Sequence, residues 1–184
     1  MKTDITQVMV AEHKLILRMI TLVEKNTELM EQGAFRNGEF YLDAVDFIRN
    51  YADRFHHAKE EDVLFNALVA NGMPAKQSPI EAMLMEHDQG RAFVGNMEEA
   101  AQKALGGELG QIPVIAENAK GYATLLRGHI DKEDTILYPL AERVLPEAGR
   151  DTIAAAYSEA EAKMPELEAK YRSMVEQYER QLSA

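Results

Sequence analysis

Histidine and glutamate residues recur in this sequence at a spacing that suits metal binding. His56 and Glu60 form one His-x-x-x-Glu motif, and His129 and Glu133 form a second. Residues four apart lie one turn apart on the same face of an α-helix, so the imidazole and the carboxylate of each motif can reach one point. Imidazole suits first-row transition metals, and a carboxylate can bridge two ions.

The two motifs belong to a longer internal duplication. The segment HHAKEEDVLF at 56–65 aligns without a gap with HIDKEDTILY at 129–138. His13 and His87 match each other more loosely, because each follows a glutamate after a short apolar run, in MVAEH and MLMEH. The spacing from His13 to the first motif nearly equals the spacing from His87 to the second. The duplication therefore predicts two helical hairpins of the same plan.

The apolar neighbours of these residues indicate that they point into a core. Ala52 and Leu64 lie four residues before and after the first motif. Leu125 and Leu137 hold the same places around the second. Burying these carboxylates and imidazoles without partners would cost several kcal/mol per charge, so we expect cations to compensate them. The predicted metal ligands are His13, His56, Glu60, His87, His129 and Glu133.

This set of nitrogen and oxygen donors suits iron or manganese better than a structural zinc site. Two histidines for each metal, with Glu60 and Glu133 as bridges, leave one coordination position open. A small molecule such as dioxygen or nitric oxide could bind there. The ferritin-like alternative needs a glutamate three residues before a histidine, and no histidine in this sequence has one.

The residue His57 leaves a choice of register open. His57 and Glu61 also form a His-x-x-x-Glu pair. The gapless alignment with 129–138 favours His56 and Glu60, which makes His57 a surface residue or a partner of the ligands. Other residues have two interpretations, as partners of the site or as ordinary surface or core residues: Glu12, Glu86, Arg91, Tyr51, Tyr122 and Tyr138.

Long helices are required to present these residues. Helical periodicity and Gly and Pro residues predict four segments, at about 4–32, 38–70, 78–105 and 112–145. The third has a strong start, in which Ser78 caps the helix, Pro79 takes the first position and Glu81 bonds back to the amide of the cap residue.

A fifth helical segment is predicted beyond these four. We expect Asp151 to cap it and Pro165 to kink or divide it. The predicted fold is all-α, an antiparallel up-down-up-down four-helix bundle over 1–150. A C-terminal helical extension, 151–184, would pack on the bundle or form a contact in a homo-oligomer.

The composition argues against several other classes of function. The 184 residues include no cysteine, which removes disulfides, thiolate metal sites and cysteine nucleophiles. A formal net charge of −11 disfavours binding to nucleic acids and to anionic membranes. The N-terminus lacks the apolar core of a signal peptide, and no stretch has the apolar length of a membrane span. We therefore expect a cytoplasmic protein without a nucleic-acid or membrane partner.

The motifs of the sequence resemble those of the hemerythrin-like, or HHE cation-binding, domain family. The resemblance covers about 4–145 and is carried by His13, FHHAKEEDVLF, Glu86-His87 and GHIDKEDTILY. It implies an antiparallel four-helix bundle with two iron ions, bridged by carboxylates and an oxo or hydroxo group, and with manganese or zinc as alternative metals. It also implies a protein that binds or senses dioxygen, nitric oxide or iron. The alternative is a di-iron oxidoreductase, peroxidase-like or iron-centre repair protein.

The sequence departs from the resemblance in three places. Oxygen-carrying members have a second histidine one turn after the first on the third helix, where this chain has Arg91. They also have an aspartate where this chain has Glu133. One ligand fewer argues against reversible oxygen carriage and favours sensing or redox reactivity. Repair relatives often carry an N-terminal region with cysteine, which this chain lacks.

Overall fold

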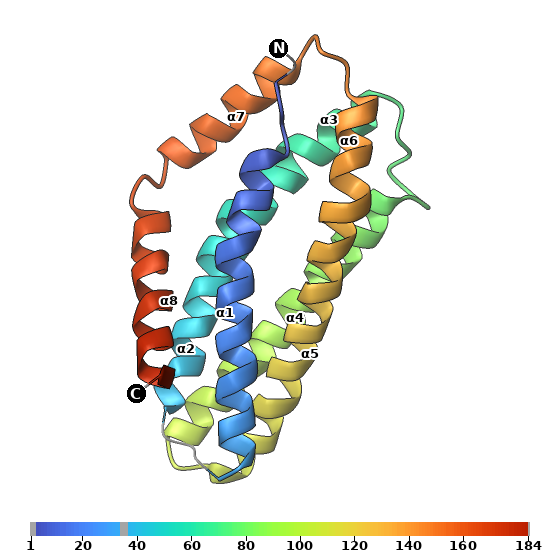
Figure 1. The fold of residues 1–184 in the computed structure, drawn as a ribbon. Coiled ribbons are helices and arrows are strands. Elements are labelled where there is room, and N and C mark those ends of the chain that lie inside the picture. The colour runs from blue at the N-terminus through green and yellow to red at the C-terminus, as the bar shows by residue number, and fades with distance from the viewer. Residues whose placement is uncertain (1–2, 34–36, 184) are drawn as a thin grey trace.

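The computed structural model describes residues 3–33 and 37–183, and within these ranges the regular secondary structure is entirely helical (Figure 1). The all-α prediction is therefore confirmed. The outermost residues of the two predicted domains, 1–2 and 184, lie outside the described residues. No helix in the described part of the chain has the length and apolarity that a membrane span requires.

Two of the long segments are regular α-helices. Helix α1 spans Gln7–Glu31, and Gly33 follows it with a φ of 84°, in the left-handed region. Helix α4 spans Pro79–Leu105. Ser78 caps α4 as predicted, because its Oγ accepts a hydrogen bond from the amide of Glu81. The Glu81 carboxylate accepts from the amide of Gln77 at 2.6 Å, one residue before the position that we predicted.

The other two long segments change from α-helical to π-helical turns along their length. The second consists of α2 (Gly38–Phe47), η1 (Ile48–His57), η2 (Glu60–Leu64) and α3 (Phe65–Ala70). The fourth follows the 3₁₀ turn η3 (Leu109–Gln111) and consists of α5 (Ile112–Lys132), η4 (Glu133–Leu137) and α6 (Tyr138–Val144). The π-helical stretches η1, η2 and η4 were not predicted. Such wide turns occur frequently at functional sites.

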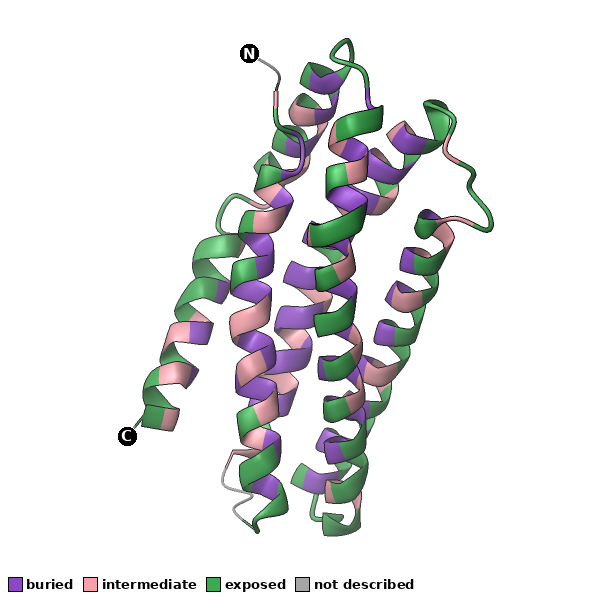
Figure 2. Cartoon of the chain, turned by 45° about the vertical axis from the view of Figure 1, so that its right-hand side comes forward, coloured by how far each residue is buried: buried purple, intermediate pink, exposed green. Residues whose placement is uncertain are grey.

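These four segments lie side by side, with buried residues on their inner faces and exposed residues on their outer faces (Figures 1 and 2). Their buried apolar residues form two clusters. The larger includes Met19, Phe47, Met97 and Ala119, and the smaller includes Leu68 near the opposite end of the bundle. The predicted ligand residues lie between the two clusters, which exclude water from both sides.

Two further helices follow, α7 (Arg150–Ala162) and α8 (Leu167–Ser183). Helix α7 begins after Gly149, whose φ is 106°, so Asp151 lies in the first turn and is not the N-cap that we predicted. Glycine takes the place of a side-chain cap here because its backbone tolerates the left-handed conformation. Pro165 lies between the two helices and divides the segment.

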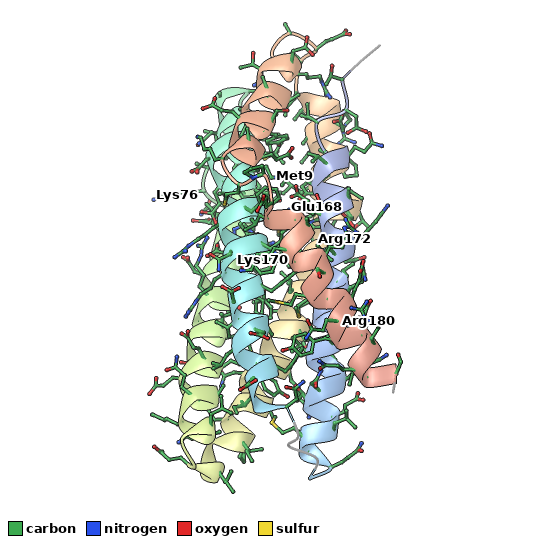
Figure 3. All side chains as sticks on the ribbon, turned by 90° about the vertical axis from the view of Figure 1, so that its left-hand side faces the viewer. Met9, Lys76, Glu168, Lys170, Arg172 and Arg180 are labelled. Carbon is green, nitrogen blue, oxygen red and sulfur yellow. The ribbon has the colours of Figure 1, made fainter. Side chains whose placement is uncertain are left out.

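Helix α8 lies across the α1 and α2 side of the bundle (Figure 3). The Arg18 guanidinium on α1 pairs with the Glu179 carboxylate at 2.7 Å. On α2, Asp46 accepts hydrogen bonds from Tyr171 and Lys170, each at 2.9 Å. The Tyr171 ring is itself fully buried. These contacts join the C-terminal segment to the same chain's bundle.

Candidate metal centre

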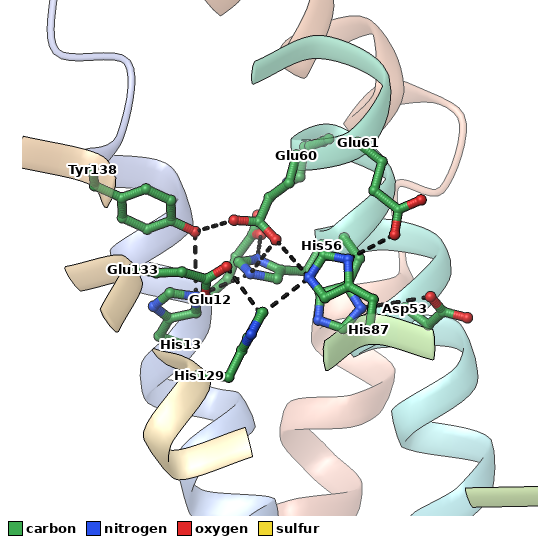
Figure 4. Close-up of polar contacts among 12 residues, drawn as sticks. Glu12, His13, Asp53, His56, Glu60, Glu61, His87, His129, Glu133 and Tyr138 are labelled. Carbon is green, nitrogen blue, oxygen red and sulfur yellow. Dashed lines mark hydrogen bonds and ion pairs between the residues drawn. The ribbon is translucent and has the colours of Figure 1, made fainter. Parts of the chain in front are cut away.

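Each of the four long segments places at least one imidazole in the middle of the bundle (Figure 4). His13 comes from α1, His56 from η1, His87 from α4 and His129 from α5, and all are almost completely buried. Figure 4 shows them gathered around the carboxylates of Glu60 and Glu133. The structure therefore brings together the six side chains that the sequence selected. Their role as metal ligands is a proposal that rests on this geometry.

The four imidazoles form two pairs. The Nε2 atoms of His13 and His56 lie 3.0 Å apart, and those of His87 and His129 also lie 3.0 Å apart. On the outer side of each ring, Nδ1 lies 2.7 to 2.8 Å from a carboxylate oxygen. The outer partners are Asp134 for His13, Glu12 for His56, Glu61 for His87 and Glu86 for His129.

This arrangement assigns the protons of the imidazoles. An ionised carboxylate only accepts hydrogen bonds, so wherever the outer partner is ionised, Nδ1 carries the hydrogen and donates it outward. The neutral ring then has its lone pair on Nε2. Two lone pairs thus face each other at 3.0 Å in each pair, and a proton or a metal ion must lie between them. Carboxylates that hold histidines in this way are common behind metal ligands.

Glu60 faces one imidazole from each of the two pairs, and so does Glu133. Glu60 Oε2 lies 3.9 Å from His56 Nε2 and 3.5 Å from His87 Nε2. Glu133 Oε2 lies 3.4 Å from His13 Nε2, and its Oε1 lies 3.0 Å from His129 Nε2. Each carboxylate therefore spans the two pairs, which is the position of a bridging ligand.

The oxygen atoms of these two glutamates also test whether metal ions fit. Within the described residues, Glu60 Oε2 and both oxygens of Glu133 are buried and lack a hydrogen-bond partner. An ionised carboxylate without partners is costly to bury. Cations between the imidazole pairs would compensate these oxygens, so the donor set fits a pair of metal ions. Glu60 opens η2 and Glu133 opens η4, so both bridges begin on π-helical turns.

Tyr138 is a further polar side chain at the centre. Its hydroxyl donates to Glu60 Oε1 at 2.7 Å, and its ring stacks on His13 with 5.6 Å between centroids. Of the two interpretations that the sequence allowed for Tyr138, the structure shows a hydrogen-bonded residue beside the site.

His57 is buried, which excludes the first of its two predicted interpretations, a surface residue, and leaves the second, a partner of the ligands. Its ring stacks on His87 with 3.8 Å between centroids, and its Nδ1 lies 3.5 Å from Asp53. Ligand atoms of His57, Glu60, His87 and His129 all lie within 4.8 Å of one another, and those of His13, His56 and Glu133 form a second such group. Glu61 contacts the outer nitrogen of His87 and turns away from the centre.

The pKa values show how the metal-free centre carries its charge. Burial lowers the pKa of His13, but the nearby carboxylates of Asp134 and Glu133 outweigh it and raise the pKa to about 9. His87 behaves in the same way beside Glu60 and also has a pKa of about 9. Burial holds the pKa of His56 well below its usual value. Protons therefore take the place of cations at the centre, and metal binding must displace them.

A lysine stands behind one imidazole in each pair. Lys59 bonds Glu12, the outer partner of His56, and Lys132 bonds Glu86, the outer partner of His129. Lys59 is only 1% exposed and also contacts Glu161 of α7 at 3.2 Å, whereas the Lys132 side chain is 40% exposed. Burial raises the pKa of Glu12 to about 7.

Sequence reasoning gave Glu12 and Glu86 as optional partners but did not identify the roles of Asp134, Glu61 and the two lysines. The signal was present in the duplication. Glu61 and Asp134 occupy equivalent positions in the aligned segments, as do Lys59 and Lys132. An acid and a lysine kept at equivalent positions could have been recognised as parts of the site.

Comparison with known proteins agrees with this geometry. The family model of the hemerythrin HHE cation binding domain matches residues 4–141 of the chain. This range contains the six central residues and their outer carboxylates, and it ends before α7. No curated protein and no solved structure matches the chain.

Proposed function

The chain belongs to the hemerythrin HHE cation-binding domain family, and from this premise we propose that it holds two iron ions and binds or senses dioxygen or nitric oxide. The observation that supports this proposal most strongly is the pairing of imidazole Nε2 atoms at 3.0 Å beside carboxylate oxygens without hydrogen-bond partners in the described residues. The six side chains offer nitrogen and oxygen donors, which suit iron, and manganese and zinc are the alternative metals.

The ligands divide into two positions with shared bridges. His13 and His56 would hold one ion, and His87 and His129 would hold the other. Glu60 and Glu133 would contribute to both. When bound, an iron pair supplies a change of oxidation state and an open coordination position for a small molecule.

The surrounding residues position the ligands. The four outer carboxylates fix the protonated nitrogen of each imidazole and so keep Nε2 available. The Tyr138 hydroxyl donates to Glu60 Oε1, with 2.7 Å between the two oxygens, and orients that carboxylate. The two apolar clusters exclude water from both ends of the centre.

We also propose the antiparallel up-down-up-down topology for the bundle. The connections between α1 and α2 and between α4 and α5 are short, and long helices joined by short connections favour antiparallel neighbours.

A peroxidase-like di-iron oxidoreductase is the second candidate function. The observation in its favour is the Tyr138 hydroxyl, which holds a proton beside the centre. This candidate predicts repeated turnover of peroxide where the first predicts a lasting change of spectrum.

Rapid mixing of the reduced, iron-loaded protein separates the two functions. Mixing with dioxygen or nitric oxide is expected to give a lasting spectral change. Rapid consumption of many equivalents of hydrogen peroxide, with no lasting response to either gas, would support the oxidoreductase. The same mixing with the metal-free protein serves as the control.

A further inference from the structure

A cavity of about 80 Å³ adjoins the centre on one side. His57, His87 and His129 contribute to its wall, whereas His13 and His56 do not. Its wall also includes apolar side chains, among them Val94 and Leu126, and four charged residues, Arg49, Asp53, Glu86 and Arg91. The cavity therefore connects with only one of the two imidazole pairs.

Tyr122 on α5 lines this cavity and is only 2% exposed. In the described part of the chain its hydroxyl has no hydrogen-bond partner. Burial raises the pKa of Tyr122 above its usual range, so the hydroxyl stays protonated and can donate. Gly90 faces the ring, and a Cβ at this position would lie 3.4 Å from Tyr122 Cε2. The glycine thus keeps space open beside a buried donor that lacks an acceptor.

The charges around the cavity are compensated within the protein. The Arg49 guanidinium pairs with Glu98 at 2.6 Å, and the Arg91 guanidinium pairs with Asp53 and Glu61 at 2.7 Å. The arginines at the wall are therefore not free to hold an anion. Two buried polar atoms of the lining lack a hydrogen-bond partner in the described residues, the Tyr122 hydroxyl and His57 Nδ1. Apolar side chains with few polar atoms and no free charge favour a neutral ligand.

The volume limits the size of that ligand. A cavity needs a volume of roughly 10–15 Å³ to hold one water molecule, and an apolar cavity of about 150 Å³ can hold benzene. A cavity of about 80 Å³ lies between these limits and suits a molecule of a few non-hydrogen atoms.

We propose that this cavity binds a small neutral molecule with a short alkyl end and an oxygen atom that accepts a hydrogen bond from Tyr122. The proposal that this molecule binds depends only on the shape and lining of the cavity. Its role as the ligand that reaches the His87 and His129 side of the centre rests on the proposed function.

The test uses propan-1-ol as the probe on the metal-free chain of 184 residues, with methyl resonances of the cavity residues followed by NMR. The methyl groups of Val94 and Leu126 are expected to shift on titration, whereas those of Val175, a buried residue of α8, are not. Propionate, which is similar in size but charged, is expected to cause no shift at these positions. Equal binding of propionate, or shifts only outside the cavity, would overturn the proposal.

Two substitutions examine the donor and the space separately. Tyr122→Phe removes only the hydroxyl and is expected to weaken propan-1-ol binding roughly five-fold, as the loss of one hydrogen bond implies. Gly90→Ala narrows the cavity and favours the helix, so it should fold and also weaken binding. The matched control is Tyr157→Phe, because the Tyr157 hydroxyl is also buried without a partner in the described residues but does not line this cavity.

Unchanged affinity in Tyr122→Phe, or equal weakening in the Tyr157→Phe control, would contradict the proposal. The iron content of each variant is measured on separately loaded samples. A wild-type protein that binds propan-1-ol in the cavity but no iron would refute the proposed function and leave the cavity site standing. These two failures are therefore distinguishable.

Discussion

The pair formed by His13 and His56 and the pair formed by His87 and His129 have the same internal geometry but different surroundings. Both have 3.0 Å between Nε2 atoms and a carboxylate on each Nδ1. Behind the first pair, Lys59 is buried beneath α7. Beside the second pair lie the cavity and the half-exposed Lys132.

The difference separates what the duplication provides from what the rest of the chain adds. The imidazoles, the bridging glutamates and the outer acids come from the duplicated motifs. The cover over Lys59 comes from the C-terminal segment, which has no counterpart on the other side. His57 stacks on His87, and its counterpart in the second motif is Ile130. The duplicated residues therefore define the centre, and the unduplicated residues make its two sides unequal.

The largest expected effect is the loss of both metal positions on removal of one bridge. Glu60→Ala should weaken the binding of both ions by at least roughly 100-fold, because the carboxylate faces both imidazole pairs. The matched variant His56→Ala should mainly affect the ion of its own pair. Calorimetric titration with ferrous iron measures both. Loss of a single ion in Glu60→Ala would show that the carboxylate does not bridge.

The second effect is a rise of metal affinity with pH. His13 and His87 have raised pKa values of about 9, so their protonated forms stabilise the metal-free fold below the unfolded value of about 6.5. That stability is lost as the pH rises through about 9. Metal ions compete with the same protons, so affinity should increase across this window. Titrations at several pH values, with zinc as a redox-inert ion, would measure the slope, and a flat profile would contradict the account.

The same titrations compare the two pairs below neutral pH. Burial raises the pKa of Glu12 to about 7, whereas the pKa of Glu86 is lowered, because its contacts with Lys132 and His129 outweigh its burial. Protonation of Glu12 removes the acceptor behind His56. The first position should therefore lose affinity more steeply than the second as the pH falls below 7. If the metal affinities of the two positions fell equally as the pH was lowered below 7, the proposed difference between the two pairs would be contradicted.

A third comparison concerns the two lysines. Lys59→Met leaves the Glu12 carboxylate buried without its main partner and should lower the free energy of unfolding by about 3–5 kcal/mol. Lys132→Met removes a partly exposed contact and should cost no more than about 1 kcal/mol. Urea unfolding of the metal-free proteins measures the difference. Equal losses would show that burial beneath α7 does not distinguish the pairs.

The smallest expected effect comes from the C-terminal segment itself. Glu161→Gln removes the charge that contacts Lys59 from a partly exposed position, so its cost should stay within about 1 kcal/mol. Glu159→Gln, on the outer side of the same helix, is the control. If urea unfolding gave both variants the same free energy of unfolding as the wild type, the contact of α7 with Lys59 would stabilise the protein through packing alone.

The sequence predicted the helices and the central residues because both follow from local spacing. The duplicated motifs place His56 with Glu60 and His129 with Glu133 on single faces, and that signal survives without any knowledge of packing. Contacts between helices do not follow in this way. The outer partner of His13 is Asp134, 121 positions away, and their meeting depends on how the helices are rotated against each other.

The π-helical turns and the burial of His57 were missed for a related reason. Periodicity alone predicts a uniform α-helix through Glu60 and Glu133, but π-helical turns begin at both residues. The histidine and the glutamate of each motif still face the same centre, because the π-helical stretches extend over only a few turns. The apolar pattern of its own helix allowed His57 to be a surface residue. Its burial involves a contact with another helix, because its ring stacks on His87.

Anaerobic titration of the metal-free protein with ferrous iron tests the central claim most directly. The account predicts two ions per chain in the wild type and fewer than one in the double variant His56→Ala, His129→Ala, which removes one imidazole from each pair. Binding of a single ion by the wild type, or of two ions by the double variant, would contradict the claim that the paired imidazoles and the shared carboxylates form a two-metal centre.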